Sequence, residues 1–244
     1  MLYKEWLFAR QKLLFVLGLY AGAAVLVVTV FSPNYLNQQV DPVFHTWILI
    51  TLFLTGAMGI FGGVDTVAEE ADKGTISFLL TRPVSRNNIF LTKLALNAAV
   101  IAAIFGLSSV IVFFLDKIPR VHLNYTRVTI PDGWYLEATG TVAVPTTGVW
   151  EALVSTTAVI LLGLVFLCLS ALVSVFVRNT ITAILLTFIF TGVFLAAIAV
   201  FNDHFIKSRI DYLVFMNPNI LPLLILPVIV FLLAGLASFK HKEF

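Results

Sequence analysis

The chain has 244 residues, of which 60% are hydrophobic and only 11% are charged, and its formal net charge is +2. Soluble domains carry about 25% charged residues, so a soluble core of this size could not hide so much apolar surface, and part of the surroundings must be lipid. The small net charge gives no indication of a nucleic-acid partner. The single cysteine, Cys168, excludes an intrachain disulfide.

Residues 1–12 mix charged and apolar side chains. Leu2, Trp6 and Ala9 share one face at helical spacing. A basic amphipathic helix with a tryptophan is typical of the membrane interface. We therefore expect an interfacial helix at 1–12, and the alternative is that these residues only form a charged flank to the first membrane span.

Six apolar stretches are long enough to cross a bilayer, for which about 20 mostly apolar residues are needed. They are residues 13–31, 44–64, 93–115, 151–177, 180–201 and 220–239. None of them carries a charged residue near its middle. The sequence therefore predicts an all-α membrane protein with six transmembrane helices, forming a single transmembrane domain over residues 1–244.

The distribution of Lys and Arg predicts the orientation of these spans, because cytoplasmic segments are enriched in both residues. With the N-terminus inside, the outer segments hold a minority of the 15 basic residues, namely Lys117, Arg120, Arg127, Lys207 and Arg209. We therefore expect a multi-pass protein of the cell (plasma or inner) membrane. Both termini and a connecting segment at 65–92 would face the cytoplasm.

The loop expected at 116–150, between the third and fourth spans, differs in kind from the other connections. Its residues 121–130 and 134–144 are rich in Val, Thr, Tyr and Trp, and the turn residues Pro-Asp-Gly at 131–133 separate them. This pattern is typical of a β-hairpin. The sequence therefore predicts a small extracellular β element in this loop.

Pairs of glycines mark places where helices can approach one another. Gly18 and Gly22 in the first span, and Gly59 and Gly63 in the second, are each four residues apart. This spacing permits close backbone contact between helices in lipid. It also occurs frequently by chance in apolar helices, so it only indicates where to look for such contacts.

Residues 65–93 form the only long stretch that is rich in both charge and turn residues between two spans. Four apolar residues share one face at helical spacing, so a helix could continue from the second span and lie on the inner membrane surface. They are Val67, Ala71, Phe78 and Leu79. The alternative is an amphipathic connector whose charges are merely solvated.

Three residues punctuate this segment. Gly74 weakens a helix by about 1 kcal/mol relative to Ala and so predicts a bend. Pro83 disfavours helical geometry at Arg82. Ser85 is a suitable N-cap for a new helix that leads through Asn88 into the third span. The predicted order is helix, bend, short helix, break and helix.

Other functional classes are less well supported. The sequence has no G-x-x-x-x-G-K-[ST] loop, so the chain itself has no usual ATP site. Ion-coupled carriers usually have charged residues inside their membrane spans, and the centres of these spans have none, which argues against a carrier of that kind. The four histidines are scattered, without an H-E-x-x-H motif, so we expect no catalytic or metal site. A membrane scaffold or anchor for a soluble partner remains an alternative, and an intramembrane hydrolase is a weaker one.

Residues 70–93 carry a motif that resembles the permease subunits of ABC-2 type ABC transporters. The matching positions are Glu70, Gly74, Thr75, Leu79, Leu80, Pro83, Ser85, Arg86 and Lys93. The six-span layout, the N-terminal amphipathic helix and the larger outer loop after the third span resemble that family as well. The chain is most similar to the small single-domain permeases, including those of the NosY type.

This resemblance implies that the segment between the second and third spans is a coupling helix that docks on a separate ATPase subunit. The residues implied for coupling are Glu69, Glu70, Gly74, Thr75, Arg82, Pro83 and Arg86. The two glutamates would face basic groups of the ATPase, and the glycine and threonine would shape the turn. Arg82, Pro83 and Arg86 would complete the fold of the segment before the third span. Which glutamate matters more stays open.

The resemblance also implies the partners. Two ATPase subunits would bind ATP and magnesium, and this chain would hold no cofactor of its own. A second permease subunit, identical or related, would complete the substrate path, which the family typically lines with spans 2 and 5. The family mostly exports, so export is the expected direction, and the substrate stays open.

Overall fold

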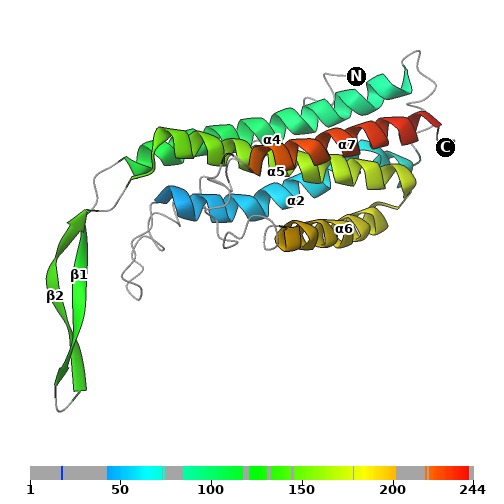
Figure 1. Ribbon diagram of the computed structural model, residues 1–244. Helices are drawn as coiled ribbons and strands as arrows, with labels where there is room; N and C mark the ends of the chain where they lie inside the picture. The colour runs from blue at the N-terminus through cyan, green and yellow to red at the C-terminus, as the bar shows by residue number, and fades with distance from the viewer. Residues whose placement is uncertain are drawn as a thin grey trace.

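The computed structural model describes residues 18, 43–72, 74, 85–117, 121–130, 133–143, 146–177, 179–201, 218 and 220–241. The elements of this part of the chain are α2 (Val43–Asp72), α4 (Arg86–Asp116), β1 (Val121–Ile130), β2 (Gly133–Ala143), α5 (Val149–Phe176), α6 (Thr180–Phe201) and α7 (Ile220–His241). The helices form an elongated bundle, and the two strands project from one end of it (Figure 1). The interfacial helix expected at 1–12 lies outside the described residues, as does the first expected span apart from Gly18.

Four of the described helices are long and apolar enough to cross a membrane. Their apolar stretches are Ile50–Asp72, Asn87–Asp116, Val149–Phe176 and Ile220–Lys240, and a shorter apolar stretch covers Thr180–Phe194 in α6. A helix suits lipid because it satisfies its own backbone hydrogen bonds. The all-helical bundle is therefore confirmed with four candidate spans, while the complete six-span arrangement remains a prediction.

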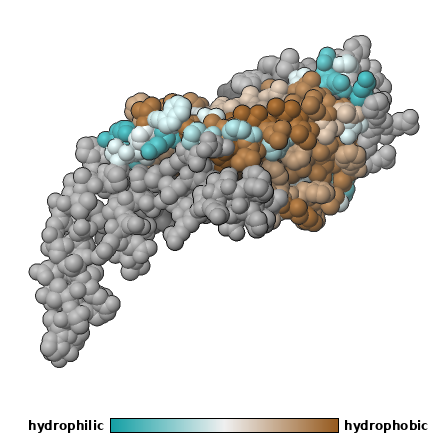
Figure 2. Space-filling model, viewed as in Figure 1, coloured by the Kyte–Doolittle hydropathy of each residue, from teal (hydrophilic) through white to brown (hydrophobic). Residues whose placement is uncertain are grey.

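The outer surface of the bundle is apolar. Large hydrophobic side chains are exposed on several helices, among them Phe61, Leu107, Phe114, Phe176 and Leu233. Figure 2 shows this apolar surface over the helices, with hydrophilic residues gathered mainly near the two ends of the bundle. A surface of this kind matches the lipid interior of a membrane better than water.

Helix α5 is the central helix of the bundle. In its most apolar 18-residue window 72% of the residues are buried, against 33% in the corresponding window of α4 and 17% in that of α7. Its side chains belong to both larger apolar clusters, with Leu167 in one and Phe166 in the other. The other described helices therefore pack around α5.

Helices α2 and α5 approach so closely that their backbones touch. A Cβ atom placed on Gly63 would lie 2.5 Å from the Leu167 carbonyl oxygen and 2.5 Å from Ser170 Cβ, and one placed on Gly59 would lie 2.7 Å from the Gly163 carbonyl oxygen. Only glycine fits these two positions without a local shift. The glycine pair of the second span, whose spacing permits such an approach, therefore lies where the two helices meet.

Because the two helices are so close, two hydroxyl groups of α5 contact polar atoms of α2. The Ser170 hydroxyl donates to the carbonyl oxygen of Ile60 at 2.6 Å, and the hydroxyls of Thr66 and Ser174 lie 3.3 Å apart. Hydrogen bonds between helices stabilise membrane bundles by about 0.6 kcal/mol each. The α2–α5 pair therefore combines backbone contact with polar links along one seam.

Strands β1 and β2 form an antiparallel hairpin. Their register runs from Val121 opposite Ala143 to Ile130 opposite Gly133, with an irregularity between Asn124 and Tyr125. Both strands occur within one residue of the ranges expected from the sequence. Figure 1 shows the hairpin extending away from the bundle at the end where α4 stops and α5 starts.

Candidate functional site

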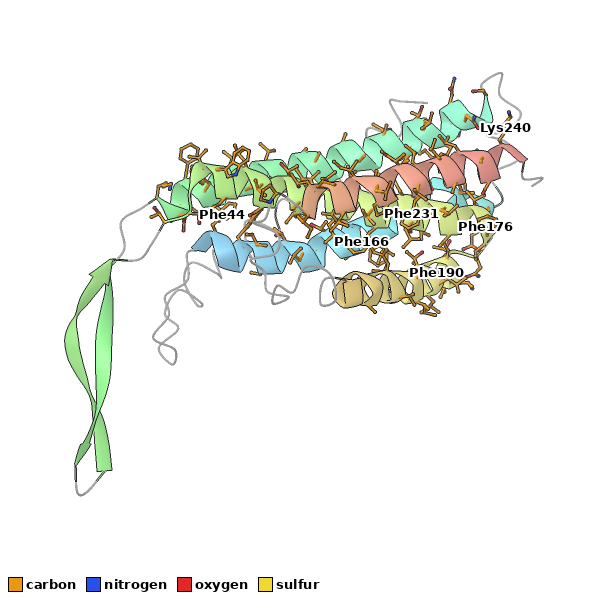
Figure 3. The ribbon with its side chains drawn as sticks, in the orientation of Figure 1. Phe44, Phe166, Phe176, Phe190, Phe231 and Lys240 are labelled. Atoms are coloured by element: carbon orange, nitrogen blue, oxygen red, sulfur yellow. The ribbon has the colours of Figure 1, made fainter. Side chains whose placement is uncertain are left out.

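The segment that the sequence marks for coupling connects two helix ends at one end of the bundle. Helix α2 ends at Asp72 and α4 begins at Arg86. The start of α6 and the end of α7 lie at the same end, which Phe176 and Lys240 mark in Figure 3, whereas Phe44 marks the opposite end. We call residues 65–72, 85–93, 179–182 and 235–240 the basal cluster.

Local sequence explains how α4 begins. Ser85 has extended backbone angles, φ −62° and ψ 143°, and its side chain accepts a hydrogen bond from the Asn88 amide at 3.3 Å. A serine at this position satisfies one of the amides that the first helical turn leaves without a partner. The N-cap predicted from the sequence is confirmed.

Gly74 explains how α2 ends. Its φ of +68° lies in the left-handed region, which glycine adopts without steric cost. Its amide donates to the Ala71 carbonyl at 3.2 Å, which closes the last turn in the way that helix-terminating glycines do. Helix α2 thus ends next to the residue at which the sequence predicts a bend, and the short helix predicted after it lies outside the described residues.

Residues 65–72 continue α2 as a single helix, but their apolar face does not lie on the outside of the bundle. Val67 is only 1% exposed and packs in the main apolar cluster with Phe90, Ala171 and Phe239. At Val67 this differs from the expected helix on the inner membrane surface, while Phe78 and Leu79, the other large apolar residues of that expected face, lie outside the described residues. The ends of α4, α5 and α7 cover this face, and a packing partner distant in sequence cannot be read from helical periodicity.

A partly buried ion pair joins the two helix ends. Lys93 Nζ on α4 donates to Glu70 Oε1 on α2 at 2.9 Å. The side chain of Lys93 is 6% exposed and that of Glu70 is 26% exposed. A charge-assisted bond of this length in a poorly solvated place is a strong directional contact.

A second polar contact links α2 and α4 deeper in the bundle. The Asn97 side-chain amide donates to the Gly62 carbonyl oxygen at 2.8 Å. Lys93 and Asn97 are four residues apart, so they share one face of α4. Helix α4 is therefore attached to α2 at two successive turns.

The other two helices of the basal cluster are attached as well. The Thr180 hydroxyl donates to Asp72 Oδ2 at 3.0 Å, which links α6 to α2. The rings of Phe90 and Phe239 lie 5.3 Å apart, which links α4 to α7. These contacts connect the ends of α2, α4, α6 and α7 at one end of the bundle.

The structure describes some of the site residues inferred from the sequence and not others. Glu70 and Gly74 are placed as described above, and Glu69 is partly exposed near the end of α2. Arg86 is the first residue of α4. Thr75, Arg82 and Pro83 lie outside the described residues.

The structure adds contacts that sequence reasoning missed. Lys93 stood at the end of the motif, but nothing in the sequence assigned it a partner 23 positions away. The contact between Asp72 and Thr180 spans 108 positions. A lysine at the start of an otherwise apolar span was the only available signal, since such a residue needs a partner when it is buried.

At the opposite end of the bundle, a polar clasp holds the base of the hairpin. The Thr147 amide donates to Asp116 Oδ2 at 2.7 Å, and Lys117 Nζ donates to the Thr147 carbonyl at 2.5 Å. Asp116 is only 5% exposed. The segment before β1 is thus tied to the segment after β2.

Metal chemistry finds no support in the part of the chain that the structure describes. Within those ranges, no group of three or more His, Cys, Asp or Glu residues could hold a metal ion.

Comparison with known proteins agrees with the family suggested by residues 70–93. The sequence profile described as "ABC-2 family transporter protein" matches residues 2–209, which is most of the chain. No curated protein matched the sequence. The closer likeness to NosY-type permeases remains a prediction. With its long apolar helices, this is a multi-pass membrane protein, and the chain belongs to the ABC-2 family as the transmembrane permease subunit of an ABC transporter.

Proposed function

We propose that this permease is part of an exporter and that residues 65–93 couple it to a separate ATPase subunit. The observation that carries the proposal is the basal cluster. The connector between α2 and α4 emerges from two helix ends that are joined by the Glu70–Lys93 ion pair. A force applied to the connector from the aqueous side would therefore reach the bundle instead of being absorbed by loose helix ends.

The mechanism follows from this attachment. Two ATPase subunits bind ATP and magnesium, and their closure displaces the 65–93 segment of this chain. The displacement passes along α2 to α5 through the glycine contacts at Gly59 and Gly63. Such a switch works only if the ATPase binds one state of the permease more tightly than the other. The contact made by residues 65–93 must therefore differ between the two states.

The distance between the polar residues at the two ends of α4 supports a membrane that spans the length of this helix. Lys93 and Asp116 lie about 35 Å apart along a helix that rises about 1.5 Å per residue. The hydrocarbon core of a bilayer is about 30 Å thick. The basal cluster and the clasp at Asp116 would then lie at opposite membrane surfaces. By the distribution of Lys and Arg, the basal cluster and both termini face the cytoplasm, and the hairpin is extracellular.

The exposed face of α6 supports a second permease subunit. Ala183, Thr187 and Thr191 are buried, so α6 packs against its own bundle through a stripe of small and polar residues. Ile181 and Leu185 expose 69% and 58% of their surface. In the assembly, lipid and a second subunit, identical or related, would share this face. The substrate path would lie between the two subunits.

The experiment is co-purification of the permease with a co-expressed ABC ATPase subunit, followed by measurement of ATP turnover in liposomes. Glu69→Lys and Glu70→Lys should each weaken assembly or uncouple ATP turnover from the permease. Glu151→Lys is the matched control, because Glu151 lies at the other end of the bundle, where it accepts from the Gly148 amide. Unchanged assembly and unchanged ATP turnover in both Glu69→Lys and Glu70→Lys would contradict the proposal.

The same experiment distinguishes the transporter from a membrane scaffold. A scaffold would bind its soluble partner through the same segment. It would not change that partner's rate of ATP hydrolysis when it is reconstituted in lipid. A permease-dependent rate supports the transporter.

A further inference from the structure

We propose that Glu70 and Lys93 form a brace that makes the two ends of the coupling segment move as one body. Glu70 then acts mainly through Lys93, as a positioning residue, and not as a direct contact of the ATPase. This inference rests on the proposed function, because it concerns how the coupling segment transmits force. It addresses the question, left open by the sequence, of what Glu70 contributes.

The burial of Lys93 is the first support. Its side chain is only 6% exposed, and its neighbour on α4, Leu94, is itself buried at 6%. A buried ammonium without a partner is costly, and removing one member of a buried pair destabilises far more than the pair itself stabilises. The contact therefore stays closed in the folded bundle, and α2 and α4 separate only when it breaks.

The second contact makes the attachment rigid. A single ion pair between two helices would still let one helix rotate about that point. The bond from Asn97 to the Gly62 carbonyl at 2.8 Å gives a second point on the same face of α4. Two points along one seam resist rotation as well as separation. The ends of α2 and α4 therefore behave as one lever that carries residues 73–84.

The position of Glu70 makes it the outer end of this lever. Glu70 lies two residues before the end of α2 at Asp72, and Lys93 lies near the start of α4. The contact is thus the last described polar link between these helices before the chain enters the 73–84 connector. Any displacement of the connector reaches the brace before it reaches the membrane-spanning parts.

Hydrogen–deuterium exchange on the permease–ATPase complex in lipid nanodiscs tests the brace, with and without ATP and orthovanadate. In the wild type, trapping should change the protection of residues 65–72 and 85–93 together. In Glu70→Gln and Lys93→Met the complex should still form, but the response should be lost from one of the two stretches. The reversed pair, Glu70→Lys with Lys93→Glu, should restore the joint response.

Two further variants complete the design. Glu151→Gln changes a carboxylate at the opposite end of the bundle, where it accepts from the Gly148 amide, and should respond like the wild type. Lys93→Arg keeps the charge and should also keep the joint response, so it provides a result even where Lys93→Met fails to fold. Glu70→Gln is isosteric at a site that is 26% exposed, so its fold should be retained.

The outcomes separate the two proposals. A joint response that persists in Glu70→Gln, or that is absent from Lys93→Arg, overturns the brace while the complex and its ATP turnover remain. A wild-type permease that binds no ATPase overturns the proposed function instead, and the brace with it. Loss of ATPase binding in Glu70→Gln alone, with Lys93→Met still bound, would assign Glu70 to the docking surface and also overturn the brace.

Discussion

Replacing Gly63 by alanine tests whether the backbone contact between α2 and α5 holds the bundle together. The new Cβ atom would lie 2.5 Å from the Leu167 carbonyl oxygen and 2.7 Å from the Ala171 amide nitrogen, whereas ordinary contacts begin at 3.4 Å. Both atoms belong to the backbone and cannot rotate away. The two helices must therefore separate locally by roughly 1 Å, because van der Waals repulsion rises steeply below the optimal distance.

This separation has a calculable cost. Overpacking of this kind typically destabilises by about 1–3 kcal/mol. It would also stretch the bond from Ser170 to the Ile60 carbonyl, now 2.6 Å, beyond hydrogen-bonding distance, and links of this type contribute about 0.6 kcal/mol each. Alanine gains up to about 1 kcal/mol of helix propensity over glycine. A control glycine must therefore supply the reference.

Gly106→Ala is that control. Gly106 lies in α4, and a Cβ atom placed there meets nothing within 4 Å. Both substitutions gain the same helix propensity, so their difference isolates the helix contact. We expect Gly63→Ala to be less stable than Gly106→Ala by about 2–4 kcal/mol. The measurement is reversible unfolding in mixed micelles with increasing SDS, followed by circular dichroism. A difference below about 0.5 kcal/mol, the range of neutral surface substitutions, would refute the reasoning.

Three further predictions concern the ends of the helices. Ser85→Ala removes the acceptor of the Asn88 amide and should destabilise the start of α4 by about 1 kcal/mol; unchanged hydrogen exchange at that amide would contradict it. Gly74→Ala places a side chain at φ +68° and should cost about 1–2 kcal/mol in micellar unfolding, and Gly74→Asn should cost less; equal stabilities would argue against this explanation of the bend. Asp116→Ala leaves the buried Thr147 amide without its 2.7 Å acceptor, which should cost about 1–3 kcal/mol of stability and speed proteolysis within residues 118–145. Asp116→Asn keeps an acceptor and should not change the cleavage rate. Equal cleavage rates in the two variants would exclude the clasp.

The features that could be predicted from the sequence are local ones. Ser85 as an N-cap and Gly74 as a bend depend on the chemistry of a few neighbouring residues, so they can be read without knowledge of the fold. The candidate spans depend on the length of apolar runs, and the strands depend on composition and turn residues. The family followed from short-range spacing in the motif at 70–93, and the profile match over 2–209 confirmed it.

The packing of these elements was decided only by the tertiary structure. The partner of Lys93 lies 23 positions away in the sequence, and that of Ser170 lies 110 positions away. The continuation of α2 through Val67 is amphipathic in either environment, and only the neighbouring helices show that protein covers its apolar face. Periodicity reports which side of a helix is apolar, but lipid and protein are equally apolar surroundings for it. The identity of the covering surface therefore depends on contacts between distant segments, and these determine which helix ends are joined.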